Sequence, residues 1–271
     1  MTRPSFSDYG TYDESAYPEL WEGVIGAWCP SLGPTGDRLH NLSRYNNWGT
    51  LTNIDPATDW VVSGGQYALD FDGVNDYAMI GAYDTLNSTT QYVSAWIRPT
   101  AVASDYTVYS MSNTAASVYR GLWVTAGSLR WAWGSTGGSY RWYTTAAATI
   151  TANRWQHVAA GHIGTGAPSI WINGVSQTTT LTSAGVNSLP SVQQSDIGRL
   201  GNNFYFQGQI DDVVVRNRPV SDNEIRGLYL LGPAGMYERR RRTARRAAIE
   251  QAGFRAYWAR RQNQIIGGGV R

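Results

Sequence analysis

Two aspartate-rich phrases are the first places in the chain where side chains could do chemistry. The phrase "DFDGVND", which contains Asp72 and Asp76, has four Asp or Asn side chains in seven residues, and "IDDV" adds Asp211 and Asp212. Carboxylate and amide oxygens are the ligands that Ca²⁺ takes in proteins. The same residue types also cap backbone amides in turns. Adjacent residues of a regular strand point to opposite faces, so at most one of Asp211 and Asp212 is expected to join such a site.

The side chains needed for catalysis are scarce. Hydrolysis of a glycosidic bond uses a pair of carboxylates that flank the bond, and no glutamate lies between Glu22 and Glu224. No G-x-S-x-G phrase is present that would position a nucleophilic serine. The single cysteine, Cys29, lies in the apolar run "GVIGAWC" and is expected to be a buried thiol. We therefore predict that the protein is not an enzyme.

Aromatic residues are abundant and concentrate in one predicted hairpin. The phrases "LRWAWG" and "YRWYTT", on either side of "GSTGG", contain Trp131, Trp133, Tyr140 and Trp142. The two-residue period of a strand places Trp131 with Trp133 on one face, and Tyr140 with Trp142. Exposed rings would offer a stacking surface to a sugar or to another protein, so these four residues are the candidate ligand-binding residues. The alternative, that the rings fill the core, stays open for each of them.

The C-terminal segment, residues 238–271, differs in composition from the rest of the chain. Its ten arginines and two glutamates give a net charge of +8, whereas residues 1–237 carry −6. Apolar residues recur at helical spacing toward Phe254 and Trp258, so we predict a partly helical tail that docks on a partner. An arginine run can also neutralise phosphates, but a single basic tail on an acidic body favours a protein partner over nucleic acid. The candidate docking residues are Arg239, Arg240, Arg241, Arg242, Arg245, Arg246, Phe254, Tyr257 and Trp258.

Between its two ends the sequence is typical of an all-β protein. From residue 23 to about residue 218, short runs rich in Val, Ile, Tyr, Trp and Thr, one of them "VSQTTTL", are separated by Gly, Asn, Asp, Ser and Pro. This pattern predicts an antiparallel sandwich or jelly roll. A short helix is expected over Pro219–Leu230, where Ser221 and Glu224 can form a capping box. The predicted organisation is an N-terminal arm (1–22), a β domain (23–230), a linker (231–237) and the basic tail (238–271).

Six phrases occur in a recognisable order within residues 23–229: "LDFDGVNDYAMIG", "VSAWIRP", "RWQHVAAGH", "IWINGV", "DIGRLG" and "FQGQIDDVVVRNRPVSDNEIRGLY". Together they resemble the laminin G-like group of concanavalin A-like jelly rolls. The resemblance implies two curved antiparallel sheets packed face to face, with a short closing helix. It also implies glycan binding and a structural Ca²⁺ ion at a sheet rim, held by Asp72, Asp76 and one of Asp211 and Asp212. The Glu-x-Asp-x-x-Glu motif of the hydrolases with this fold is absent.

The arginine run followed by "FRAYWARRQNQIIGGGV" is similar to the ends of virion-associated proteins of tailed bacteriophages. This resemblance implies a structural protein of the virion, foremost a capsid decoration protein whose arms attach it to the major capsid or tail protein. The alternative is a carbohydrate-binding adhesin or host-recognition component of a phage tail, which would bind a host-surface glycan. We expect a homo-oligomer assembled in the bacterial cytoplasm, since no signal segment or membrane-spanning apolar run is apparent.

Overall fold

The computed structural model describes residues 17–45, 47–82, 87–113, 118–135, 139–185 and 188–237. The basic tail, with all of its candidate docking residues, lies outside the described residues, as do residues 1–16 of the predicted arm. The described chain forms a sandwich of antiparallel sheets with two short α-helices, which confirms the predicted fold class.

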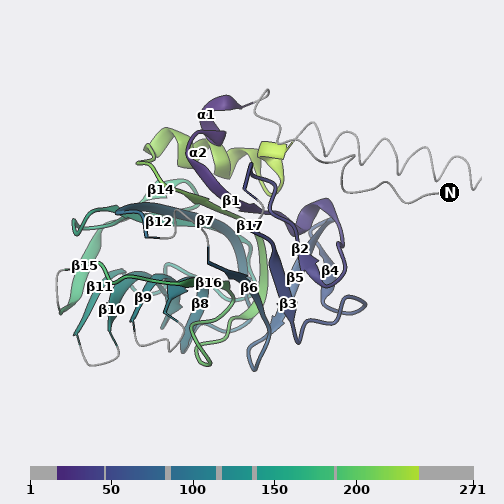
Figure 1. The fold of residues 1–271 in the computed structure, drawn as a ribbon, viewed down its shortest axis with the longest axis horizontal. Helices are drawn as coiled ribbons and strands as arrows, with labels where there is room; N and C mark the ends of the chain where they lie inside the picture. Colours follow the sequence, from purple (N-terminus) through teal and green to yellow (C-terminus); the bar gives the residue numbers. More distant parts are fainter. Residues whose placement is uncertain are drawn as a thin grey trace, which may run out of the picture.

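Two sheets lie face to face (Figure 1). Sheet A has eight strands, with β1 (Val24–Trp28) beside β17 and the others in the order β14 (Val175–Ser176), β13 (Ser169–Ile172), β12 (Gln156–Ile163), β7 (Thr90–Pro99), β17 (Gln207–Arg216), β5 (Gln66–Asp72) and β4 (Trp60–Ser63). Sheet B has nine strands in the order β15 (Thr179–Ala184), β11 (Ser139–Thr145), β10 (Ser128–Ser135), β9 (Val118–Thr125), β8 (Asp105–Ser112), β16 (Gln194–Ile197), β6 (Tyr77–Gly81), β3 (Gly49–Thr52) and β2 (Arg38–Leu39).

The core between the sheets follows from the two-residue period of the strands. In β10, Leu129, Trp131 and Trp133 belong to the core and are fully buried, whereas Arg130 and Ala132 lie on the other face of the strand. The central strands of sheet A, β7, β12 and β17, are buried on both faces, because helices cover the outer face of the sheet there (Figure 1). No helix of the described residues covers the outer face of sheet B, where the loop between β16 and β17 packs against part of the sheet instead (Figure 1).

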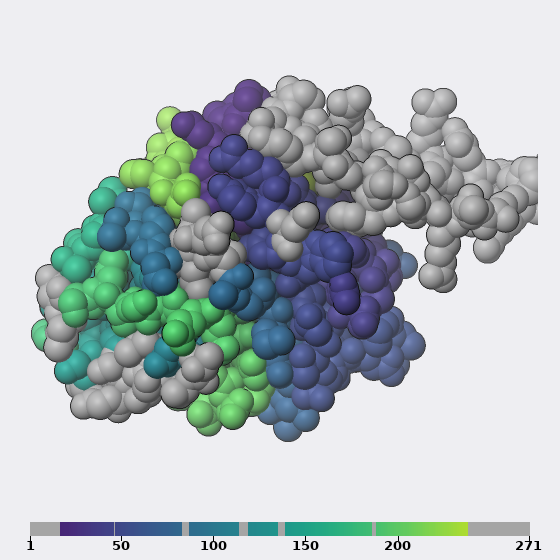
Figure 2. Space-filling model, viewed as in Figure 1, coloured from purple at the N-terminus to yellow at the C-terminus, as the bar shows by residue number. Residues whose placement is uncertain are grey.

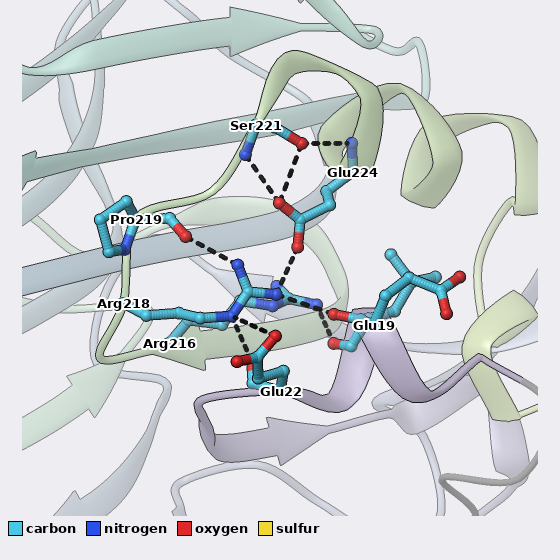
Figure 3. Close-up of polar contacts among 8 residues, drawn as sticks. Glu19, Glu22, Arg216, Arg218, Pro219, Ser221 and Glu224 are labelled. Atoms are coloured by element: carbon cyan, nitrogen blue, oxygen red, sulfur yellow. Dashed lines mark hydrogen bonds and ion pairs between the residues drawn. The ribbon is translucent and has the colours of Figure 1, made fainter.

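The predicted closing helix is present as α2 (Asp222–Leu231). The hydroxyl of Ser221 accepts a hydrogen bond from the backbone N–H of Glu224 at 3.2 Å, and the Glu224 carboxylate accepts one from the N–H of Ser221 at 2.8 Å (Figure 3). These two bonds form the expected capping box, which satisfies backbone donors that a helix start otherwise leaves free. The sequence signal for this helix is confirmed.

Arg218 ties the two ends of the described chain together. Its guanidinium pairs with Glu224 of α2 and donates hydrogen bonds to the backbone carbonyls of Glu19 at 2.7 Å and Glu22 at 2.9 Å (Figure 3). Glu19 belongs to α1 (Pro18–Trp21). The early and late segments therefore pack side by side, as the purple and yellow-green atoms of Figure 2 show.

The folded domain extends beyond the predicted boundaries at residues 23 and 230. Residues 231–237, expected as a linker, contain the 3₁₀ turn η3 (Gly235–Tyr237), in which Met236 and Tyr237 are buried. The Tyr237 ring meets Trp21, a residue of the predicted arm, edge-on at a centroid distance of 5.4 Å. These segments are ordered because the outer face of sheet A is apolar and has to be covered. The folded domain therefore includes residues 17–22 and 231–237.

One predicted strand is divided between the two sheets. The phrase "VSQTTTL", residues 175–181, is one of the runs that predict a single strand. In the structure Val175–Ser176 pairs with β13 in sheet A, and the following segment Thr179–Ala184 pairs with β11 in sheet B. The chain thus crosses from one sheet to the other, and the pattern of polar and apolar residues contains no mark of that crossing.

Candidate functional site

A pocket of about 250 Å³ opens on the outer face of sheet B. Four adjacent strands, β8 to β11, form its floor and walls, and the loop between β16 and β17 closes one side. The lining residues are Asp105, Tyr119, Trp123, Arg130, Ala132, Tyr140, Trp142, Leu200, Asn203 and Phe204. Most of them alternate along the strands with core residues, so regular strand geometry aims them outward.

The strands beneath the pocket have small residues beside a large ring. Gly121, Ala132 and Trp142 occupy neighbouring register positions on β9, β10 and β11. A Cβ atom on Gly121 would lie 2.3 Å from the backbone oxygen of Tyr109, so only glycine fits this position without a shift of the strands. The hollow is therefore formed by strand pairing, which holds its shape more firmly than a loop does.

The aromatic rings of the pocket hold one another in place. Tyr140 stacks on Trp142 at a centroid distance of 5.3 Å and on Tyr119 at 5.8 Å. The indole N–H of Trp142 donates a hydrogen bond to the hydroxyl of Tyr119 at 3.2 Å. Burial raises the pKa of Tyr119 to about 12, so its phenol stays neutral at physiological pH. Trp123 meets Tyr119 edge-on at 5.4 Å and completes the aromatic cluster.

One ion pair lies among the rings. Nη1 of Arg130 is 3.4 Å from Oδ2 of Asp105, and the Thr125 hydroxyl donates a hydrogen bond to the other carboxylate oxygen. The guanidinium carbon of Arg130 also lies 4.4 Å from the ring centre of Trp142, which is a cation–π contact. The Asp105 side chain is 37 % exposed and that of Arg130 is 16 % exposed. The carboxylate is therefore the more accessible partner.

Phe204 forms the rim of the pocket and is 48 % exposed. Its φ of 54° is a left-handed conformation that costs a bulky residue about 1–3 kcal/mol. The surrounding turn holds it: Leu200 and Asn203 exchange backbone hydrogen bonds at 3.1 and 3.0 Å, and the Phe204 carbonyl accepts the N–H of Thr107 at 2.9 Å. Beyond Phe204 lies a shallower hollow of about 780 Å³, which shares Asp105, Asn203 and Phe204 with the pocket.

The four aromatic residues predicted to bind a ligand are divided between the two faces of sheet B. Trp131 and Trp133 lie in the core with no exposed surface, so their prediction as ligand-binding residues was wrong. Tyr140 and Trp142 line the pocket. The reason is the register of the hairpin: Trp142 pairs with Ala132 and Tyr140 pairs with Gly134, and cross-strand partners share a face.

The sequence interpretation missed much of the pocket, including Asp105, Arg130 and Phe204. A signal existed for β9, whose phrase "VYRGLWVT" places Tyr119, Gly121 and Trp123 on one face by the two-residue period. That pattern identifies residues of the pocket only when the pairing of β9 with β10 is known. Phe204 lies in a loop and has no periodic signal.

The aspartates of "DFDGVND" cap a tight turn between β5 and β6. The Oδ1 atom of Asp72 accepts the backbone N–H groups of Val74 at 2.7 Å and Asn75 at 3.1 Å. Asp76 is buried, and its Oδ2 atom accepts the N–H of Asp72 at 2.9 Å. Burial raises the pKa of Asp76 to about 6. These contacts are the turn-capping alternative that the sequence left open.

Asp211 and Asp212 lie elsewhere, buried beneath the helical cover of sheet A. Asp211 accepts hydrogen bonds from Ser31 in the 3₁₀ turn η2 (Pro30–Leu32), and Asp212 lies close to Tyr237. A β-bulge at this point, with Asp212 at φ 49°, places both carboxylates on the outer side of the sheet. The expectation that they point to opposite faces was therefore wrong.

The two aspartate pairs do not form one ligand set. Asp72 lies on β5 opposite Gln207, which begins β17. Asp211 lies further along β17, opposite Trp96 of β7. Within the described ranges, no group of three or more His, Cys, Asp or Glu side chains could hold a metal ion. Structural Ca²⁺ stays a prediction. Cys29 is a buried free thiol, as expected.

Residues 72–226 match the laminin G-like family model described as the Concanavalin A-like lectin/glucanases superfamily. The fold is similar to that of the binding domain of botulinum neurotoxin serotype D, with a TM-score of 0.58 and 14 % identity over 78 % of this chain and 52 % of that one. It is also similar to the binding domain of Paraclostridial Mosquitocidal Protein 1, with a TM-score of 0.55 and 14 % identity over 79 % of this chain and 53 % of that one. A third similar structure is Trypanosoma rangeli sialidase, with a TM-score of 0.56 and 15 % identity over 77 % of this chain and 32 % of that one. The chain thus spans about half of each toxin domain and a third of the sialidase. No curated protein sequence matches it. No helix in the part of the chain that the structure describes is long and apolar enough to cross a membrane. With more than half of its length matched by the family model, the chain belongs to the concanavalin A-like lectin/glucanase superfamily.

Proposed function

We propose that the protein is a non-enzymatic carbohydrate-binding protein and that the pocket on sheet B holds the sugar. One observation carries the proposal: the half-buried rings of Tyr140 and Trp142, with the exposed ring of Phe204 at the rim, surround a charged pair on the outer face of sheet B. Aromatic faces bind the apolar face of a sugar ring, and a few placed polar groups bind its hydroxyls. The lectins in the family description support this use of the fold.

The pocket is prepared for a ligand before the ligand arrives. Its rings are fixed by stacking and by the hydrogen bond between Trp142 and Tyr119, and its floor belongs to paired strands. Little side-chain freedom is lost on binding, because these rings are already packed. The shallower hollow beyond Phe204 gives room for a second sugar unit, which favours an oligosaccharide over a free monosaccharide.

A glycan array probed with the full chain tests this proposal. We expect binding to a limited set of glycans, and the substitution Phe204→Ala should reduce it at least tenfold, because it removes the most exposed ring of the pocket. Trp48→Ala is the matched control, since Trp48 is 38 % exposed and lies outside the pocket. Binding that survives Phe204→Ala but is lost with Trp48→Ala would place the site elsewhere, and a chain that binds no glycan would refute the proposal.

We further propose that the protein is a structural component of a bacteriophage virion, either a capsid decoration protein or part of a tail, and that the domain is displayed on the particle. The uneven distribution of charge along the sequence favours this second function. Residues 238–271 carry a net charge of +8, whereas residues 1–237 carry a net charge of −6. The proposed partner is the major capsid or tail protein, and the domain would be present in several copies as a homo-oligomer. Arginine suits such docking, because its planar fork binds carboxylates bidentately.

Deletion of residues 238–271 tests the attachment. The deletion begins after Tyr237, because that residue is buried against Trp21 and belongs to the folded domain. We expect the shortened protein to keep the unfolding midpoint of the full chain and to be missing from purified particles, as measured by proteomics with copy number. Normal incorporation would contradict the attachment role, whereas a copy number of hundreds favours the capsid over the tail.

A further inference from the structure

We propose that the pocket selects an uncharged sugar, whose neighbouring hydroxyl groups are bound by the Asp105–Arg130 ion pair, and that it discriminates against sugars that carry a carboxylate, sulfate or phosphate. This inference rests on the proposed glycan-binding function and names the class of sugar that the same pocket takes. It follows from the charge, the accessibility and the hydrogen-bonding capacity of the two residues.

The charges of the pocket cancel. Among its described lining residues, Asp105 is the acidic one and Arg130 the basic one, and Tyr119 stays neutral because burial raises its pKa to about 12. Nη1 of Arg130 already faces the Asp105 carboxylate at 3.4 Å. An anionic sugar would therefore find no uncompensated positive charge, which is the usual means of binding carboxylate, sulfate or phosphate groups.

Accessibility strengthens the discrimination. Asp105 exposes 37 % of its side chain and Arg130 only 16 %, and one face of the guanidinium is covered by the Trp142 ring. A ligand that enters the pocket meets the carboxylate first. An anion would have to approach this carboxylate in a partly buried site, where like charges repel more strongly than in water.

The same pair is well suited to two neighbouring hydroxyl groups. A carboxylate only accepts hydrogen bonds and a guanidinium only donates them, whereas a hydroxyl does both. One hydroxyl of a sugar can thus donate to Asp105 while the next accepts from Arg130. Bonds to charged groups are about twice as strong as bonds between neutral groups, so this arrangement gives both affinity and orientation.

The rings decide how the sugar lies. Arg130 occupies one face of Trp142, whereas Phe204 is 48 % exposed at the rim beside Asp105 and Asn203. The apolar face of the sugar therefore packs against Phe204, with its hydroxyl edge turned toward the ion pair. The volume of about 250 Å³ is just below the range of pockets that hold drug-sized ligands, as expected for one sugar ring.

The test compares matched pairs of glycans, one neutral and one that differs by a terminal acidic sugar or a sulfate, by calorimetric titration of the full chain at 50 and about 500 mM salt. We expect the neutral member to bind at least tenfold more tightly, with a Kd that changes less than twofold with salt. Asp105→Asn keeps an acceptor oxygen but removes the charge, so it should reduce the preference for the neutral member at least fivefold. Asp37→Asn, an exposed aspartate outside the pocket, is the control and should leave the preference unchanged.

Two outcomes would overturn the inference, and they are distinguishable. Tighter binding of the acidic member, weakened by salt and abolished by Arg130→Gln, would refute the selection of neutral sugars while it supports glycan binding by the same pocket. The absence of binding to either member of every pair, with a folded protein shown by its unfolding midpoint, would refute the proposed function itself.

Discussion

At the scale of single residues, Asp212 is a buried carboxyl group whose pKa is strongly raised. It lies in the β-bulge of β17 at φ 49°, a conformation that Asn and Asp adopt more readily than most other non-glycine residues. Burial, with Asp211 beside it, raises the pKa of Asp212 to about 7, although Tyr237 and Arg216 act in the opposite direction. The folded protein therefore holds a proton on Asp212 that the unfolded chain, with a pKa near 3.8, releases.

This difference in pKa predicts a pH-dependent effect of Asp212→Asn. Because the folded-state pKa is raised, the favourable contribution of Asp212 is complete below about pH 4 and is lost as the pH rises through about 7. An asparagine side chain cannot ionise, so the variant does not lose stability in this way as the pH rises. Its stability relative to the wild type should be higher at pH 8 than at pH 5 by about 2 kcal/mol.

Urea unfolding midpoints of both proteins at the two pH values measure this effect. The variant is compared with the wild type at the same pH, so the contributions of His157 and His162 to stability cancel. Burial lowers the pKa values of these two side chains to about 3 and about 4, so their contributions change with pH in the opposite direction to that of Asp212. An equal stability difference at pH 5 and pH 8 would show that Asp212 is ionised in the folded protein at both pH values.

At the scale of elements, strand pairing explains what the sequence could and could not predict. The capping box of α2 and the β10–β11 hairpin depend on residues close in the sequence, and both were predicted correctly. Which face of that hairpin points outward depends on its pairing with β9 and on the cover that each sheet receives. Trp131 and Trp142 therefore looked equivalent as candidates, although one fills the core and the other lines the pocket.

The site also depends on irregular elements, which carry weak sequence signals. The bulge at Asp212 breaks the period on which the opposite-face expectation was based. Phe204 reaches the pocket from a turn closed by Leu200 and Asn203, about 60 residues or more from most of the rings that it joins. Composition identified the aromatic hairpin, but only the tertiary fold brings Asp105, Arg130 and Phe204 to it.

At the scale of the whole molecule, the two faces of the sandwich differ in how they are covered. Segments from both ends of the described chain cover sheet A, where Arg218 joins α1 to α2 and Tyr237 packs on Trp21 (Figures 1 and 3). On the outer face of sheet B, the described strands and the loop between β16 and β17 form the pocket, and no described helix covers it. This division agrees with a domain that is held from one side and binds a ligand on the other.

Binding of a neutral glycan in the sheet B pocket is tested most directly by an NMR titration that follows the indole N–H signals of the 12 tryptophans. Single Trp→Phe substitutions assign the signals. Saturation with a neutral glycan chosen from the array should shift the signals of Trp123 and Trp142, which line the pocket, and leave Trp48 unmoved. Binding that shifts Trp48 or Trp155 but leaves Trp123 and Trp142 unchanged would contradict the account, because the glycan would then occupy another surface.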